Sequence, residues 1–182
     1  KSEKKQINQI TILDENIHKV ILKTIKQNYC KTKFFNEYWE SFEDIFIKSC
    51  NTKNLSILNI SIIKWICEKL KIDCNFSNSS SYDNSQSKIE RLISINKKLN
   101  TSIYLSPIGS YDYLSEAESK FTKQNIDLVF NNYDEIKSVN ENNKLNLSII
   151  DLLFNCGFSS KKIISKGVGK PYNSSEINKI NT

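Results

Sequence analysis

The sequence predicts an α/β fold of three layers, a mostly parallel sheet with helices on both faces, in which helix outweighs strand. From residue 55 onward, segments with helical spacing of apolar residues alternate with short apolar runs that are typical of strands. Strands separated by helices of this length form parallel sheets that are covered on both faces. The 182 residues, 38% of them hydrophobic, suffice for one sizeable core, so a single domain over residues 1–166 is expected.

The first elements predicted are a strand and two helices. Apolar and polar residues alternate over residues 7–13, and Asp14-Glu15-Asn16 is expected to open a helix that ends near Tyr29. Residues 33–48 carry an aromatic stripe at helical spacing, which favours core packing because aromatic side chains dominate buried area. A cofactor-binding stripe is the alternative, but no polar residues converge on it.

The middle of the chain predicts a helix, a strand and a second helix. Residues 55–72 form the strongest helical pattern, apolar around much of its circumference. A short strand over residues 74–77 and a polar loop follow. Ser87 and Glu90 have the spacing of a capping box, which marks the start of the next helix.

The last third predicts two strands and three helices. The strands lie at residues 103–106 and 126–130, with a helix over 113–123 between them and a long polar loop over 131–146 after them. Leu147–Gly157 predicts a buried helix in which Ser148 and Asp151 form a capping box and Gly157 follows the C-terminus. A brief helix over 159–165 and a disordered tail over 167–182 complete the chain.

The charge pattern argues against nucleic-acid binding. The net charge is +6, but all of the 26 basic residues except Arg91 are lysines, scattered among 20 acidic residues. Nucleic-acid readers favour clustered charge and arginine. No apolar run approaches the roughly 20 residues that a bilayer span needs, and residues 1–5 do not introduce a signal peptide.

The cysteines predict neither a metal site nor a disulfide framework. None of the five cysteines forms a Cys-x-x-Cys pair, and the lone His18 is not near one in sequence. An odd count without a secretion signal indicates reduced thiols in the cytoplasm. The chain contains no methionine, so we expect it to be a fragment or a processed product.

Polar side chains at strand ends and in the apolar helix are the candidates for a site. Parallel sheets bind ligands at the carboxyl ends of their strands, where Ser106 is either a turn residue or a ligand contact. Arg91 offers a planar fork for a carboxylate or phosphate, although a plain surface arginine explains it equally well. Asp151 and Asn155 need partners if buried, either in the protein or on a ligand. No pattern assigns a catalytic residue.

Several short segments, taken in order, carry a resemblance to a known family. They are Lys23-Thr24-Ile25, Asn28-Tyr29, Phe34-Phe35, Glu90-Arg91-Leu92-Ile93, Tyr104-Leu105-Ser106, Tyr113-Leu114, Phe121, the strand over 126–130 and Leu147–Gly157. Their order and spacing resemble the WbqC-like protein family of bacterial surface-polysaccharide gene clusters, over roughly residues 5–165.

The chain departs from the family pattern at three places. The family opens with a His-Gln-Pro segment, a strand, a helix and an acidic strand end, none of which is present, so the chain resembles the C-terminal two-thirds of the domain. The glycine-rich turn after Tyr-Leu-Ser is here Pro107-Ile108-Gly109-Ser110, and a His-Pro and a later Gln are missing from residues 131–146. If those groups serve chemistry, the chain is altered or inactive.

The resemblance implies a role in O-antigen or related glycan biosynthesis, with transfer of glycine or another acyl group to an amino sugar. It implies an activated carboxyl donor, formed for example with ATP, a sugar-nucleotide or amino-sugar acceptor, and other glycan-pathway enzymes as partners. In that picture Arg91 meets a phosphate or carboxylate, Tyr104, Ser106 and Ser110 contact the ligand, and Asp151 with Asn155 holds a loop or the acceptor. A non-catalytic partner, or a degenerate remnant in a glycan-assembly complex, is the alternative.

Overall fold

The computed structural model describes residues 5–14, 16–82, 87–133 and 147–180. These residues fall into two compact units, whereas the sequence predicts a single domain over residues 1–166. Unit 1 comprises residues 1–74 and 135–164, and unit 2 comprises residues 75–134 and 165–182. Each unit has its own cluster of buried apolar side chains, so each is described by itself.

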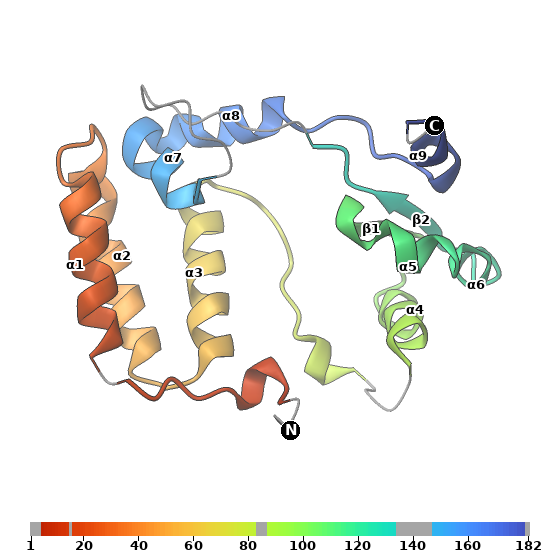
Figure 1. Ribbon diagram of the computed structural model, residues 1–182, viewed down its shortest axis with the longest axis horizontal. Coiled ribbons are helices and arrows are strands. Elements are labelled where there is room, and N and C mark those ends of the chain that lie inside the picture. Colours follow the sequence, from red (N-terminus) through yellow and green to blue (C-terminus); the bar gives the residue numbers. More distant parts are fainter. Residues whose placement is uncertain (1–4, 15, 83–86, 134–146, 181–182) are drawn as a thin grey trace. The chain divides into compact units, whose positions relative to one another are not determined.

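Unit 1 is helical. Its elements are η1 (Ile7–Gln9), α1 (Ile17–Tyr29), α2 (Phe35–Cys50), α3 (Leu55–Lys69), α7 (Ile149–Cys156), η4 (Gly157–Ser159) and most of α8 (Ser160–Lys166). The first three α-helices lie alongside one another and α7 packs against them (Figure 1). The helices predicted from residue 14 to Tyr29, over 33–48, over 55–72, over 147–156 and over 159–165 are confirmed within a few residues.

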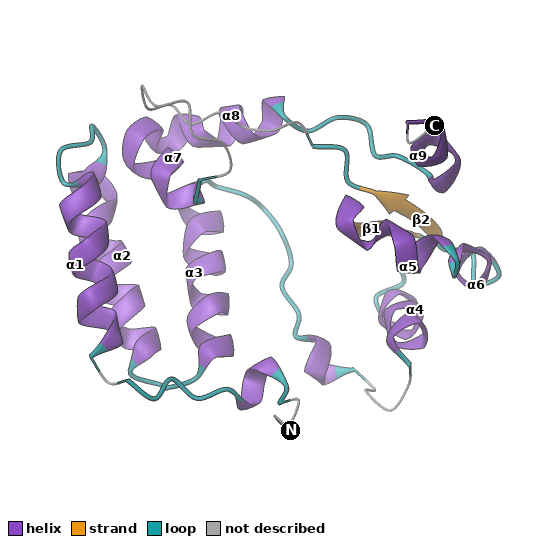
Figure 2. Cartoon of the chain, viewed as in Figure 1, coloured by secondary structure: helices purple, strands orange, loops and turns teal. Residues whose placement is uncertain are grey.

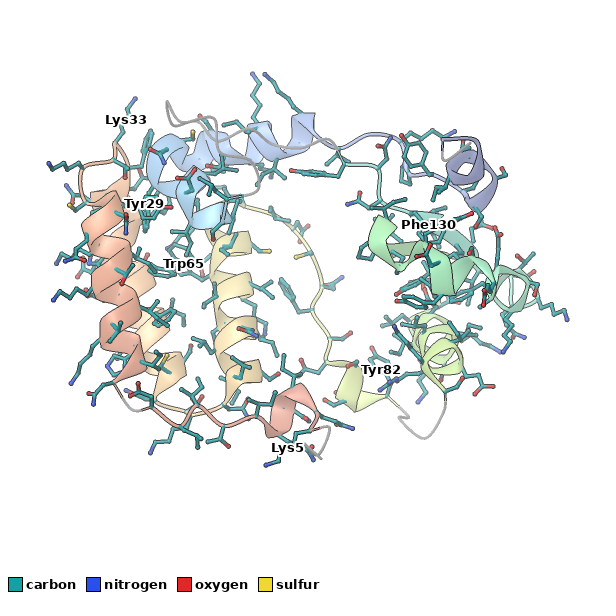
Figure 3. The ribbon with its side chains drawn as sticks, in the orientation of Figure 1. Lys5, Tyr29, Lys33, Trp65, Tyr82 and Phe130 are labelled. Carbon is teal, nitrogen blue, oxygen red and sulfur yellow. The ribbon has the colours of Figure 1, made fainter. Side chains whose placement is uncertain are left out.

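The aromatic stripe of α2 forms the core of unit 1, as the sequence predicts. Phe42 on α2 and Phe154 on α7 are fully buried, and their rings meet edge to face at 6.3 Å between centroids. Trp65 reaches the same cluster from α3, with its ring 5.3 Å from that of Phe42 (Figure 3). The α7 helix is therefore an integral part of this core and not an appendage.

The strand predicted over residues 7–13 is wrong. Residues 7–9 form a 3-10 turn, and Thr11 makes only an isolated antiparallel bridge with Asn54. The backbone of Ile12 donates to Lys53 O at 2.8 Å, and Leu55 N donates to Ile10 O at 3.1 Å. The segment with the alternating pattern thus pairs with the loop before α3. That loop cannot supply the continuous ladder of hydrogen bonds that a strand needs.

Unit 2 combines a small parallel sheet with short helices. Its strands are β1 (Ile103–Ser106) and β2 (Asp127–Phe130), paired in parallel with Ile103 opposite Asp127, and both are drawn in orange in Figure 2. Its helical elements are η2 (Ser79–Ser81), α4 (Lys88–Lys98), η3 (Ile108–Ser110), α5 (Tyr111–Ser115), α6 (Glu118–Thr122) and α9 (Ser174–Ile180). The single helix predicted over 113–123 is instead two short helices.

The sheet among the described residues is smaller than the sequence predicts. The strand predicted over residues 74–77 is wrong, because these residues are exposed and lie outside the two strands that the structure describes. The two predicted strands that remain do pair in parallel. The described residues therefore confirm a helix-rich chain with parallel strands, and the three-layer arrangement stays a prediction.

The segment after Lys166, for which the sequence predicts disorder, is ordered in the structure up to α9. Tyr172 pairs with Phe130 through two backbone hydrogen bonds of 2.7 and 2.9 Å. Ile177 on α9 is buried in the apolar cluster of unit 2. The composition of this segment does not predict its ordered structure, because Tyr172 and Ile177 contact residues that are far away in the sequence. Residues 134–146 of the predicted polar loop lie outside the described residues.

Every helix among the described residues is too short or too polar to cross a bilayer.

Candidate functional site

The α7 helix carries the first pair of candidate residues. Its N-cap is a single side-chain hydrogen bond, in which Ser148 Oγ accepts from Ile150 N at 3.4 Å. The capping box predicted for Ser148 and Asp151 is wrong, since the Asp151 side chain is 1% exposed and turns into the unit. The Asp151 carboxylate makes its side-chain hydrogen bond with Asn155 inside the unit and not with the backbone at the start of α7.

The partners of Asp151 come from two helices. Asn155 Nδ2 donates to Asp151 Oδ1 at 3.1 Å and to the Asp151 backbone oxygen at 2.8 Å. The Tyr29 hydroxyl at the end of α1 interacts with the same carboxylate. Burial raises the pKa of Tyr29, and the negative charge and the hydrogen bond of Asp151 raise it further. The hydrogen bond from Asn155 offsets part of the cost of burying the carboxylate, and the interaction with Tyr29 links α1 to α7.

Cys156 lies beside this pair and is half-buried. Burial and the nearby Asp151 charge raise the pKa of the Cys156 thiol. At neutral pH the thiol is therefore protonated, whereas the nucleophilic form of cysteine is the thiolate. In this state the thiol packs as a small apolar group.

Gly157 ends α7 in a conformation that only glycine readily adopts, with φ 57° and ψ −140°. Its backbone N–H caps the helix by donating to Leu153 O. A Cβ at this position would lie 2.7 Å from Cδ1 of Phe34, whose own backbone N–H donates to Phe154 O at 2.9 Å. The glycine thus lets the loop before α2 pack directly on the end of α7.

Two further candidates, Ser106 and Ser110, meet at the carboxyl end of β1 in unit 2. Their Oγ atoms are 2.6 Å apart, and Ser110 Oγ also donates to Pro107 O at 2.6 Å. Because a hydroxyl has one proton to donate, Ser106 is the donor to Ser110. Both side chains are buried, so in this structure the two hydroxyls close the turn, and their contact with a ligand stays a prediction.

Tyr104 and Arg91 complete the candidates in unit 2. Tyr104 is two residues before Ser106 and so lies on the same face of β1. Its ring is half-buried and stacks on Phe121 at 5.7 Å and an interplanar angle of 9°. Arg91 is half-buried in the first turn of α4, where its backbone N–H donates to Ser87 O at 2.9 Å. The ligand roles of both residues stay predictions.

The comparison with protein families identifies the chain. The model of the WbqC-like protein family matches residues 1–163. The chain belongs to the WbqC-like protein family. Of curated proteins, the uncharacterised protein Rv1507c of Mycobacterium tuberculosis (strain ATCC 25618 / H37Rv) is 28% identical over 138 residues, 74% of this chain and 58% of that relative's length. The match therefore spans little more than half of the relative. No solved structure matches.

Three segments that carry the resemblance to the WbqC-like family come together in unit 1. Tyr29 and Phe35, from the family segments at α1 and α2, place their rings 5.5 and 5.2 Å from that of Phe154 in the α7 segment. Phe34 covers Gly157. The family segments in this unit therefore pack against one another at one place. The interactions of Asp151 are the polar contacts there.

The sequence pattern predicts Tyr29 at the end of a helix but does not indicate its interaction with Asp151. A tyrosine at the buried end of a helix is a donor that needs an acceptor, and Asp151 was the carboxylate expected to be buried. The structure described for this WbqC-like chain contains no grouping of His, Cys, Asp and Glu side chains suited to a metal ion.

Replacing Tyr29 with phenylalanine should destabilise unit 1 by about 1–2 kcal/mol at neutral pH, the value of a buried hydrogen bond to a charged acceptor. A folded pKa above the ordinary value of 10.0 means that the hydroxyl contributes fully below pH 10 and that this contribution is lost as pH rises through the folded pKa. Urea unfolding of the wild type and the variant at pH 8 and at alkaline pH measures the difference.

Tryptophan fluorescence reports unit 1 alone, because Trp39 and Trp65 both lie there. Tyr113→Phe in unit 2 is the control and should leave the fluorescence transition unchanged. A stability difference between wild type and Tyr29→Phe that grows with alkaline pH would contradict the hydrogen bond to Asp151.

Proposed function

We propose that this protein acts in the biosynthesis of a bacterial surface polysaccharide such as an O-antigen, where it transfers glycine or another acyl group to an amino-sugar precursor. Membership of the WbqC-like family over residues 1–163 is the observation that supports the proposal. The relative in Mycobacterium tuberculosis is uncharacterised and adds no substrate.

The reaction joins an amine to an activated carboxyl group. The sugar amine attacks the carbonyl carbon of the donor, an acyl adenylate formed with ATP or a thioester. The amide C–N bond forms, the bond to the leaving group breaks, and the amine proton passes to the leaving group or to water. The tasks of the protein are to orient the two substrates and to exclude competing hydrolysis.

Neutral hydrogen-bond donors and acceptors are suited to the hydroxyl groups of a sugar. In this proposal Ser106, Ser110 and Tyr104 contact the acceptor from the end of β1, and Arg91 binds its phosphate or the carboxylate of the donor. Asp151 is a positioning residue, because its enclosed carboxylate can act on a ligand only through Tyr29 and Asn155.

Incubation with labelled glycine, ATP and a panel of nucleotide-linked amino sugars tests the proposal. The expected result is label in the acceptor, separated by chromatography, at a rate that falls by at least about tenfold in Ser106→Ala/Ser110→Ala, because two positioned hydrogen bonds are lost. The exposed pair Ser80→Ala/Ser119→Ala is the matched control and should keep wild-type activity. Absence of label from every acceptor would contradict the proposal.

A non-catalytic partner in a glycan-assembly complex is the second candidate. It is favoured by two hydrogen bonds between candidate side chains, Ser106 with Ser110 and Asn155 with Asp151. This function predicts no turnover together with co-purification of the protein with enzymes of the pathway. Turnover by the purified chain alone would eliminate it.

A further inference from the structure

Two helices of unit 2, α4 and α6, border a cavity that none of the candidate residues lines. Its volume is about 510 Å³, within the range of small-molecule sites. The lining residues are Glu90, Ile93, Ser94, Lys97, Lys98, Lys120, Lys123 and Gln124. We refer to this cavity as the lysine groove, because four lysines and one carboxylate line it.

The convergence of the four lysines exceeds what helix capping requires. Lys97 and Lys98 lie in the last turn of α4, and Lys120 lies in the last turn of α6, followed by Lys123. A cation at a helix C-terminus is favourable, which accounts for lysines on each helix separately. Here the ends of both helices face the same cavity, so like charges are concentrated around one space and repel one another.

Glu90 offsets only part of this charge. Its carboxylate accepts a hydrogen bond from Ser87 N at 3.2 Å in the capping box of α4, which the sequence correctly predicts. Hydrogen bonds from the Ser87 side chain and backbone lower the pKa of Glu90, and the charge of Lys120 lowers it further. The carboxylate is thus held in place as an anion, and it faces one of the four lysines.

The groove also contains a hydrogen bond between its two sides and an apolar residue, Ile93. Lys97 Nζ donates to Gln124 Oε1 at 2.8 Å and so links α4 to the residue pair that follows α6. Ile93 and Ser94, both half-buried, lie on α4 between Glu90 and Lys97. Together with the methylene stems of the lysines they form a surface for a ring or an alkyl chain beneath the charged rim.

We propose that the lysine groove binds a small molecule that carries a diphosphate, with the phosphates on the lysines and the remainder of the molecule over Ile93. Lysine binds phosphate as a point charge, whereas planar recognition of a carboxylate favours arginine. Several ammonium groups around one cavity match a multiply charged group better than a single charge. The proposal is independent of acyl transfer, because neither Ser106 nor Ser110 lines the lysine groove.

Titration of the full chain with inorganic pyrophosphate, followed by amide NMR and calorimetry at fixed ionic strength, tests the proposal. The expected result is saturable binding with shifts concentrated at residues 90–98 and 118–125, and weaker binding of inorganic monophosphate. Shifts spread evenly over the lysines of both units, or equal affinity for the two anions, would overturn the proposal.

Three variants separate a site from general attraction to a basic protein. Lys120→Gln/Lys123→Gln removes two exposed charges and should weaken pyrophosphate binding by at least about tenfold, because each charge interacts with the ligand over a few ångströms. Lys23→Gln/Lys31→Gln, an exposed pair in unit 1, makes the same change in net charge and should alter affinity by less than about twofold.

Glu90→Gln provides a test of the opposite sign. Glutamine can keep the capping box while the competing negative charge is removed, so pyrophosphate should bind more tightly. Equal weakening by the two lysine pairs, or weaker binding in Glu90→Gln with α4 intact by circular dichroism, would contradict a site in the groove.

Discussion

Replacing Gly157 with alanine should lower the free energy of unfolding of unit 1 by about 2–6 kcal/mol, the largest effect we expect from a single methyl group in this chain. Two costs add. A residue with a Cβ is strained at φ 57° and ψ −140°, which costs about 1–3 kcal/mol. The new methyl would also lie 2.7–3.0 Å from ring atoms of Phe34, and such overpacking typically costs about 1–3 kcal/mol.

Urea unfolding followed by tryptophan fluorescence measures the effect, and a double-mutant cycle with Phe34→Leu separates the two costs. The smaller leucine should relieve the overpacking but not the backbone strain, so the double variant should lose less stability than the sum of the single variants. Gly109→Ala, where a Cβ would meet nothing within 4 Å, is the control and should leave the circular dichroism transition nearly unchanged. A Gly157→Ala variant as stable as the wild type would contradict the packing of Phe34 on α7.

Replacing Asp151 with alanine should destabilise unit 1 by about 2–4 kcal/mol. The change removes one acceptor of the Asn155 amide and the carboxylate that interacts with the Tyr29 hydroxyl, and a buried donor without an acceptor costs about 1–3 kcal/mol. The effect should be visible at neutral pH as a shift of the tryptophan transition to lower urea with an unchanged slope.

Asp44 provides a matched control in the same unit. Its carboxylate is 58% exposed and pairs with Lys48 at 2.7 Å on α2, so Asp44→Ala should cost less than about 1 kcal/mol. In a cycle with Tyr29→Phe, the Asp151→Ala variant should show a coupling of about 1 kcal/mol or more. Equal costs for Asp44→Ala and Asp151→Ala would show that the buried carboxylate is not part of a network.

The sequence predicts helices better than strands, and the reason lies in how each element is stabilised. The periodic apolar residues of α2, α3 and α7 and the spacing of Ser87 and Glu90 are local signals, and all four are realised in the structure. The segments at 7–13 and 74–77 have strand-like composition, but no described strand runs beside them. A strand depends on a partner, and the pattern of one segment carries no information about that partner.

The sequence also predicts which candidate residues are buried better than it predicts their partners. Burial of Asp151 follows from the apolar helix around it, whereas its bond to Tyr29 joins residues 122 positions apart in the sequence. The sequence does not predict the lysine groove for a similar reason. Lys97 and Lys123 are far apart in a lysine-rich chain, and only the folding of α4 and α6 places them at one cavity. Helical periodicity places a side chain on a face, but only the tertiary structure shows what that face meets.

The reaction proposed for this WbqC-like protein forms an amide on an amino sugar. Mass spectrometry of the acceptor after reaction with isotope-labelled glycine tests it most directly. The account predicts an acceptor heavier by one glycyl residue, with fragmentation placing the label on the sugar nitrogen. An acceptor of unchanged mass, under conditions in which the protein is folded and an activated glycyl donor is present, would contradict it.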